Sequence, residues 1–126
     1  YEIRPRDWSS DVCSSDLSRA GHQEVAEKTV RVLKECVPPA VAGIAFLSGG
    51  QSDEEATIHL DLMNRMGPLP WPVTFSYGRA LQHMPQKVWA GKAENVAAAQ
   101  RAFAHRSHMN GLAAQGQWKQ DLEKAA

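Results

Sequence analysis

Cysteine is scarce in this sequence, and neither sign of charge is in excess. The 126 residues include two cysteines, 14 basic side chains and 14 acidic side chains. Two cysteines cannot build the disulfide framework of a small secreted protein, so a reduced, cytoplasmic setting is expected. Because the formal net charge is zero, no overall field favours nucleic acid or an anionic membrane as a partner.

Long apolar runs are also missing. The longest are far shorter than the roughly 20 residues that a transmembrane helix needs, and the N-terminus lacks the apolar core of a signal peptide. The length suits one domain, and a hydrophobic content of 43% is ordinary for a globular protein. We therefore expect a globular domain with neither a membrane nor a nucleic acid as partner.

Residues 1–17 differ in character from the rest of the chain. They show neither helical nor strand periodicity, and the stretch 7–17, DWSSDVCSSDL, is similar to the translation of a common sequencing-adapter oligonucleotide. We expect residues 1–17 to be a non-native, disordered leader and residues 18–126 to carry the native fold. The alternative is a disordered serine-rich leader, and in neither case is a function expected for Trp8 or Cys13.

The remaining chain alternates between helical and strand patterns. The expected elements, in chain order, are a helix over 23–37, a strand over 44–47, a helix from 52 to the loop at 67–72, a strand over 73–75, a short helix from 78 that is interrupted near Pro85, and a long helix over about 93–115. This order has no hairpin signal, so it predicts an α/β fold with parallel strands and right-handed crossovers.

Apolar spacing predicts which faces are buried. The stripes expected to face the core are Ala26, Val30, Leu33 and Val37 in the first helix, Ala56, Leu60 and Met63 in the second, and Val96, Ala99 and Phe103 in the last. The strand over 44–47 is uniformly apolar, which is typical of a strand buried on both faces. The tryptophans Trp71, Trp89 and Trp118 are expected to be packing anchors.

The first candidate site follows the strand over 44–47. Ser48, Gly49 and Gly50 come directly after that strand, and Ser52 with Glu55 forms a capping-box pattern that starts the next helix. Glycines let the backbone approach an anion closely, and amides near a helix start can point at it. The alternative is that the two glycines form only a tight turn.

The second strand ends in a similar way. Ser76, Gly78 and Arg79 follow the strand over 73–75, and the guanidinium fork of an arginine suits phosphate oxygens. In β/α barrels, phosphate sites are often built by the loops after the last two strands. The two strand ends together therefore predict a divided phosphate site, with a surface role for Arg79 as the alternative.

Other constellations point less clearly to chemistry. His105 and His108 lie one helical turn apart without an evident third ligand or carboxylate partner, so a solvated pair is expected and no metal site. The acids over 53–55 are explained by the dipole of the helix that they begin. No lysine falls in an expected strand, where a desolvated amine could serve covalent catalysis, so we expect a binding half-site without a nucleophile.

Two motifs, LSGGQS over 47–52 and FSYGRAL over 75–81, give the sequence a resemblance to class I fructose-bisphosphate aldolase. The likeness continues through VPPAV over 37–41, EEA over 54–56, WAGK over 89–92 and Asn95, and it covers essentially all of 23–118. The resemblance implies a partial TIM (β/α)8 barrel comprising the last two βα units and the C-terminal helices. It also implies that 44–47 is the seventh strand and 73–75 the eighth.

The same resemblance implies a function. Class I aldolases cleave fructose 1,6-bisphosphate into dihydroxyacetone phosphate and glyceraldehyde 3-phosphate through a Schiff base on lysine, without a metal or other cofactor, and are often tetrameric. Ser48, Gly49, Gly50, Ser76, Gly78 and Arg79 match the family's substrate and phosphate contacts. In that family the Schiff-base lysine lies on the sixth strand, upstream of the matching region. The sequence ends without the C-terminal tyrosine of animal members, so it resembles a bacterial-type aldolase.

We therefore expect a C-terminal, bacterial-type piece of an aldolase that is inactive by itself. Two alternatives stay open: a non-catalytic anion-binding or interaction module, and another phosphate-binding barrel enzyme.

Overall fold

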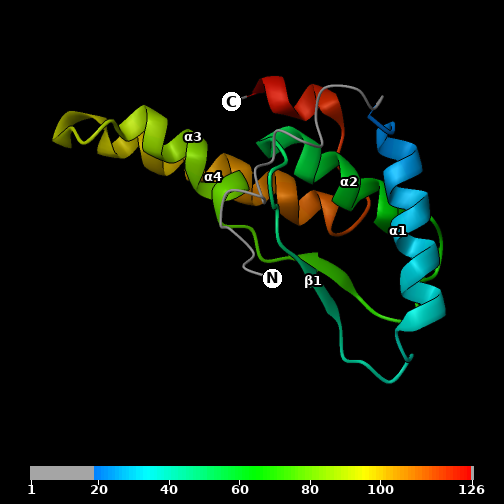
Figure 1. Cartoon of the computed structure of the whole chain (residues 1–126). Helices are drawn as coiled ribbons and strands as arrows, with labels where there is room; N and C mark the ends of the chain where they lie inside the picture. The colour runs from blue at the N-terminus through cyan, green and yellow to red at the C-terminus, as the bar shows by residue number, and fades with distance from the viewer. Residues whose placement is uncertain (1–18, 126) are drawn as a thin grey trace, which may run out of the picture.

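The computed structural model describes residues 19–125, so the predicted leader over 1–17 lies outside the described residues. The elements of the described part are, in chain order, α1 (His22–Cys36), β1 (Ile44–Phe46), α2 (Asp53–Arg65), β2 (Val73–Phe75), α3 (Arg79–Trp89), the 3-10 helix η3 (Ala93–Asn95), α4 (Val96–Ala113) and the 3-10 helix η4 (Gln120–Ala125). Figure 1 shows this order as a helix-rich α/β arrangement.

The two strands pair in parallel, as the sequence predicts. Ile44 stands opposite Val73, and Phe46 stands opposite Phe75. Within residues 19–125 the sheet has these two strands alone, so the outer edge of each strand carries no partner in the described part. Parallel strands require a crossover between them, and α2 supplies it.

One face of the sheet packs on the core, which corrects the expectation that β1 is buried on both faces. Ile44 and Phe46 are half-buried against the core, whereas Ala45 between them is exposed. Leu47, directly after β1, is 74% exposed. The reason is geometric: alternate side chains of a strand point to opposite faces, and the described helices cover one face.

Helix α2 lies at the centre of the molecule. Its predicted apolar residues Ala56, Leu60 and Met63 are all buried. The Asn64 side-chain amide lies within hydrogen-bonding distance of the carbonyls of Val73 (3.1 Å) and Ala113 (3.3 Å), which joins α2 to β2 and to the end of α4. Helix α2 therefore holds the sheet and the C-terminal helices together.

Helix α1 packs against α2 through its predicted stripe. Ala26 and Val30 are buried, and Leu33 and Val37 pack against the same core. The Trp71 indole is 2% exposed and donates to the Pro38 carbonyl at 3.0 Å, so the loop before β2 is fixed to the loop after α1.

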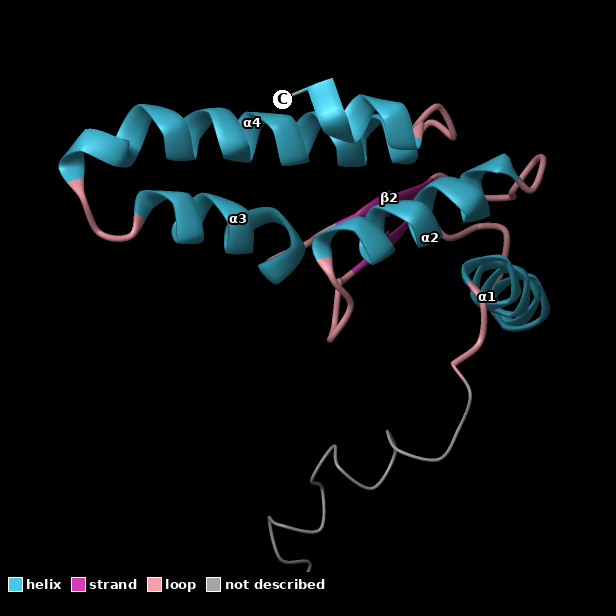
Figure 2. Ribbon diagram, turned by 90° about the horizontal axis from the view of Figure 1, so that it is seen from above, coloured by secondary structure: helices cyan, strands magenta, loops and turns pink. Residues whose placement is uncertain are grey.

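Helix α3 and the first half of α4 lie side by side and extend away from the sheet (Figure 2), whereas the second half of α4 packs against α2. Helix α3 continues through Pro85, contrary to the predicted interruption. Proline removes a single backbone donor from a helix interior, and the packing of α3 along α4 outweighs that loss.

The inward face of α4 lies further along the helix than predicted. Val96 and Phe103 are 42% and 45% exposed, whereas the buried residues are Arg106, Met109, Asn110 and Ala113. In the first half of α4, the apolar stripe lines a groove against α3 that is open to solvent. For the same reason Trp89, at the end of α3, is 46% exposed and is no packing anchor, whereas Trp71 and Trp118 are.

None of the helices described over 19–125 combines the length and apolar character needed to cross a bilayer.

Candidate functional site

The two predicted strand ends meet at one edge of the sheet. The Ser76 amide donates to the Phe46 carbonyl at 2.7 Å, which extends the ladder by one bond beyond the strands. The Arg79 guanidinium donates to the carbonyl of Gly49, across the two loops. The structure therefore brings the loop after β1 and the start of α3 into direct contact, as the sequence predicts.

Ser48 forms the base of this junction. It is 3% exposed, and its hydroxyl oxygen lies 3.4 Å from the Ala80 amide nitrogen in the first turn of α3. Because the oxygen accepts from Ala80, its own proton stays available for an anion or another acceptor. The serine thus links the β1 loop to the start of α3 while retaining a donor.

The glycines contribute differently. Gly49 has a φ of +56°, and a Cβ built on it would have no atom within 4 Å. Its requirement is therefore conformational, since non-glycine residues avoid this left-handed region. Gly50 and Gly78 have no positive φ and meet no neighbour either, so they leave the backbone open to solvent.

Ser76, Gly78 and Arg79 are all exposed at the end of β2. The Ser76 amide is already used by the sheet, so a ligand would meet the hydroxyl of this residue and not its backbone donor.

The two helix starts at this edge are capped differently. At α2, the Ser52 hydroxyl accepts from the Glu55 amide at 3.2 Å and the Glu55 carboxylate accepts from the Ser52 amide at 2.9 Å, which is the predicted capping box. At α3, the cap residue Gly78 has no side chain to cap the helix, and the Ser48 hydroxyl from the other loop accepts from the Ala80 amide instead. The positive end of the α3 dipole therefore lies beside Ser48 and Gly78 at this edge.

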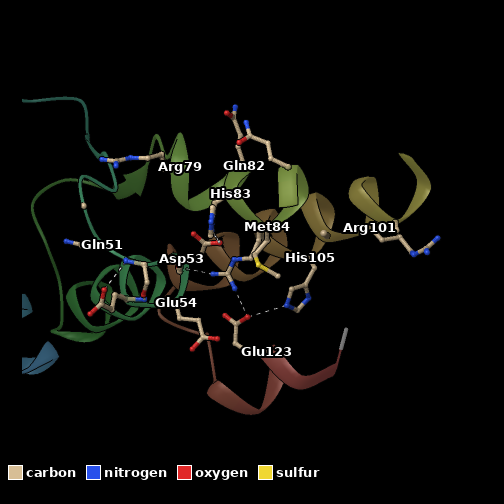
Figure 3. A pocket seen from close by; sticks show the side chains of 17 residues that line it. Gln51, Asp53, Glu54, Arg79, Gln82, His83, Met84, Arg101, His105 and Glu123 are labelled. Atoms are coloured by element: carbon tan, nitrogen blue, oxygen red, sulfur yellow. Dashed lines mark hydrogen bonds and ion pairs between the residues drawn. The ribbon is translucent and has the colours of Figure 1, made fainter. Parts of the chain in front are cut away.

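A cavity of about 1210 Å³ opens between α2, α3, α4 and η4. It reaches the predicted phosphate site at Gly50 and Arg79. Figure 3 shows Arg79 extending from α3 toward the loop after β1, whereas Asp53 and Glu123 line other parts of the cavity. The cavity wall thus carries charges of both signs, among them Arg79, Arg106, Asp53 and Glu123.

The most buried charge in the cavity wall is Arg106 of α4. It is 4% exposed, and its guanidinium donates to Glu123 Oε2 at 2.5 Å, to Thr57 Oγ1 at 2.6 Å and to the Asp53 carbonyl at 3.0 Å. A buried charge needs this kind of pairing to offset its lost hydration. The arginine therefore connects α4 to the first turn of α2 and to the C-terminal segment.

Glu123 receives donors from three side chains. Besides Arg106, the Trp118 indole donates to Oε1 at 3.0 Å, and His105 Nε2 lies 3.3 Å from Oε2. Burial alone would raise the pKa of Glu123, but the hydrogen bond and charge of Arg106, helped by Trp118 and His105, hold it below its usual value. His105 thus has a carboxylate partner, which corrects the expectation of a solvated pair, while His108 is exposed.

Within the described residues, no three side chains of histidine, cysteine, aspartate or glutamate are grouped so that they could hold a metal ion.

Sequence reasoning missed Arg106 and Glu123. The predicted stripe of α4, continued at the same spacing, runs through Arg106 and Asn110 to Ala113. A charged residue in phase with an inward stripe is the signal that could have identified Arg106. For Glu123 the sequence offers no such signal, because its partners are brought together by the return of the C-terminal segment.

The fold belongs to the parallel α/β class, and comparison with known proteins identifies its family. Residues 12–126 match the family model for glycolytic fructose-bisphosphate aldolase class I. This match begins inside the segment 1–17.

Curated relatives agree with this match. A probable fructose-bisphosphate aldolase class 1 of Xanthomonas axonopodis pv. citri is 52% identical over 80% of this chain and 30% of its own length. Cytosolic fructose-bisphosphate aldolase 5 of Arabidopsis thaliana is 52% identical over 82% and 29%. Aldolase A of Salmo salar is 53% identical over 83% and 29%.

A solved structure agrees as well. The fructose-bisphosphate aldolase of Plasmodium falciparum, in complex with TRAP and a small-molecule inhibitor, superposes with a TM-score of 0.79 at 49% identity. The likeness covers 81% of this chain and 29% of that one. The chain belongs to the class I fructose-bisphosphate aldolase family, which confirms the resemblance seen in the sequence. It spans about 30% of the length of the curated relatives that it matches.

Proposed function

We propose that this chain supplies the last two strand–helix units of a class I fructose-bisphosphate aldolase barrel, with β1 as the seventh strand and β2 as the eighth. The parallel pairing of the strands, the helix that follows each of them and the superposition on a Plasmodium aldolase support this assignment. The complete protein would be a cytoplasmic lyase, assembled as an oligomer. It would cleave fructose 1,6-bisphosphate through a Schiff base on a lysine.

Within that enzyme, the strand ends would bind one phosphate of the sugar bisphosphate. The site comprises Ser48, Gly49, Gly50, Ser76, Gly78 and Arg79. The Ser48 hydroxyl and the glycine amides would donate to the phosphate oxygens, and the guanidinium of Arg79 would balance their charge. The positive end of the α3 helix dipole lies at the same place and would also favour an anion there.

One observation carries this proposal: the hydrogen bond from Arg79 to the carbonyl of Gly49. It joins the two loops that the phosphate would bridge, and it holds the guanidinium beside the glycine backbone. A guanidinium has five N–H donors, so this contact leaves donors for an anion.

The chain should bind without catalysing. Neither β1 nor β2 contains a lysine, and the Schiff-base lysine of this family lies on the sixth strand. Borohydride reduction in the presence of dihydroxyacetone phosphate should therefore leave the 126-residue chain unlabelled in mass spectrometry. A covalent adduct would contradict this expectation.

The phosphate role of Arg79 is best tested in a complete aldolase that carries residues 19–125. Arg79→Ala should raise KM for fructose 1,6-bisphosphate by about tenfold or more, because a charge-assisted contact to the phosphate is lost. Arg31→Ala is the matched control, since Arg31 is an exposed arginine on α1, ion-paired with Glu35. Unchanged kinetics for Arg79→Ala would exclude Arg79 as a phosphate ligand.

The two alternatives from the sequence, a non-catalytic anion-binding or interaction module and a different phosphate-binding barrel enzyme, are not proposed further, because the chain belongs to the aldolase family.

A further inference from the structure

Arg106 lies behind the proposed phosphate site and is connected to it through the first turn of α2. Its guanidinium reaches the Asp53 carbonyl at 3.0 Å and the Thr57 hydroxyl at 2.6 Å. The Thr57 hydroxyl oxygen is itself 2.9 Å from that carbonyl. Asp53 is the first residue of α2, three positions after Gly50. Arg106 therefore determines where the helix begins relative to α4.

The loop after β1 is held at both ends. On one side, the sheet fixes Phe46 through the Ser76 amide at 2.7 Å. On the other side, the capping box at Ser52 makes the helix start rigid, and Arg106 ties that start to α4. The loop 47–51 spans these two fixed points, so a shift of the first turn of α2 would move Gly49 and Gly50.

The C-terminal segment holds the arginine in turn. Glu123 accepts from Arg106 at 2.5 Å and from the Trp118 indole at 3.0 Å. The Trp118 amide donates to Asp61 Oδ1 of α2 at 3.0 Å. The segment after α4 is thus attached to both α2 and α4, and its carboxylate is the counter-charge that keeps the buried guanidinium in place.

We propose that Arg106 is a positioning residue for the phosphate loop, and that Glu123 sets the position of Arg106. This inference rests on the proposed function and adds a second layer behind it. Arg106 acts through the start of α2, while Arg79 is the arginine that meets the phosphate. The C-terminal segment is thereby coupled to phosphate affinity without touching the ligand.

The test uses the same complete aldolase and inorganic phosphate as a competitive inhibitor. Arg106→Lys keeps the charge but loses the two-armed contact, and Thr57→Val removes the hydroxyl without changing the shape of the side chain. Each variant should raise both the inhibition constant for phosphate and KM for the bisphosphate by about three- to tenfold, since small misplacements weaken several contacts at once. The kcat should change less than KM.

Controls separate positioning from stability. Thr57→Ser, which keeps the hydroxyl, should restore phosphate inhibition to the unmutated value. In a double-mutant cycle, Arg106→Lys combined with Arg79→Lys should give less than the product of the two single effects, because both act on one loop. Glu123→Gln should behave like Arg106→Lys, since it removes the counter-charge.

The outcomes are distinct. Variants that melt at lower temperature but keep the unmutated inhibition constant would overturn the positioning role, and so would fully multiplicative effects with Arg79→Lys. If the unmutated enzyme shows no inhibition by phosphate, the proposed phosphate site itself fails, and this inference fails with it.

Discussion

The two strand–helix units have the same plan but differ in how their helices are stabilised. Helix α2 is capped by Ser52 and Glu55 and buries one face in the centre of the molecule. Helix α3 has no side-chain cap, contains Pro85 and buries only Ala80. The comparison shows that the two units have different roles. In the first unit, β1 and α2, the capping box satisfies the backbone at the helix start, and the buried face of α2 forms the structural core. The helix start of the second unit has no cap of its own: the Ser48 hydroxyl of the first unit accepts from its Ala80 amide, and a ligand can interact with the positive end of its dipole.

The largest expected difference between the units is in core packing. Leu60 of α2 is fully buried, and Met84 of α3 is 40% exposed. Leu60→Ala should therefore lower the free energy of unfolding by about 2–5 kcal/mol, because it leaves a cavity, whereas Met84→Ala should cost far less. Urea denaturation followed by circular dichroism measures both. If both variants lose the same free energy of unfolding, the two strand–helix units do not differ in their contribution to stability.

The two neighbouring glycines in the loop after β1, Gly49 and Gly50, should differ in how much stability an alanine substitution costs. Gly49→Ala should cost about 1–2 kcal/mol, because alanine at a φ of +56° is strained. Gly50→Ala should cost less, since its φ is not positive and an added Cβ meets no atom within 4 Å. Thermal melting of the two variants tests this order. If Gly50→Ala is the more damaging variant, the loop conformation described here is wrong.

The capping box should contribute about 1 kcal/mol to α2. Ser52→Ala removes the acceptor for the Glu55 amide, and losses of about 0.5–2 kcal/mol are typical for this change. At α3 the reverse change, Gly78→Ser, adds a hydroxyl where no side chain of the cap residue is used, so it should have little cost. Chemical denaturation of both variants would show whether one helix start depends on its cap and the other does not.

Acid should weaken the attachment of the C-terminal segment. The pKa of Glu123 is lower in the folded protein than in the unfolded chain. The carboxylate therefore stabilises the fold above its unfolded pKa of about 4.5, and this contribution is lost as the pH falls through the folded value. Glu123→Gln should be less stable than the unmutated chain at pH 7, and the difference should shrink toward pH 3. A constant difference in melting temperature would contradict this account.

The smallest effect is expected on α1. Arg31 and Glu35 form an exposed ion pair at 2.9 Å, and such pairs contribute about 0.3–0.5 kcal/mol within a helix. Arg31→Ala should therefore lie within the error of most denaturation experiments, and it sets the baseline for the other variants.

Strong local signals made most of the fold predictable. Glycines and prolines marked the loops. Apolar stripes predicted α1 and α2, and short apolar runs predicted both strands. The alternation of helices and strands without a hairpin predicted that the strands are parallel. The capping box at Ser52 was visible because it is entirely local. The predicted helix interruption at Pro85 and the predicted packing role of Trp89 were wrong. Both depend on how α4 packs along α3, and no local pattern encodes that contact.

The candidate site was predictable for a similar reason, and only in part. The motifs after each strand are contiguous, so the loop at Ser48 and Gly49 and the arginine at Arg79 could be assigned to one candidate site from the sequence. The structure adds the hydrogen bond from Arg79 to the Gly49 carbonyl. Arg106 and Glu123 are different, because their partners come from α2 and from the returning C-terminal segment. A buried charge whose counter-charge is distant in sequence becomes visible only when the chain is folded.

The outer edges of β1 and β2 have a consequence for assembly. Each edge presents backbone donors and acceptors without a partner among residues 19–125, and such edges readily accept further strands. In the barrel proposed above, a separate polypeptide that carries the other six strand–helix units would pair with both edges and complete the ring. Mixing the two polypeptides and assaying for cleavage of fructose 1,6-bisphosphate tests this consequence of the proposed function.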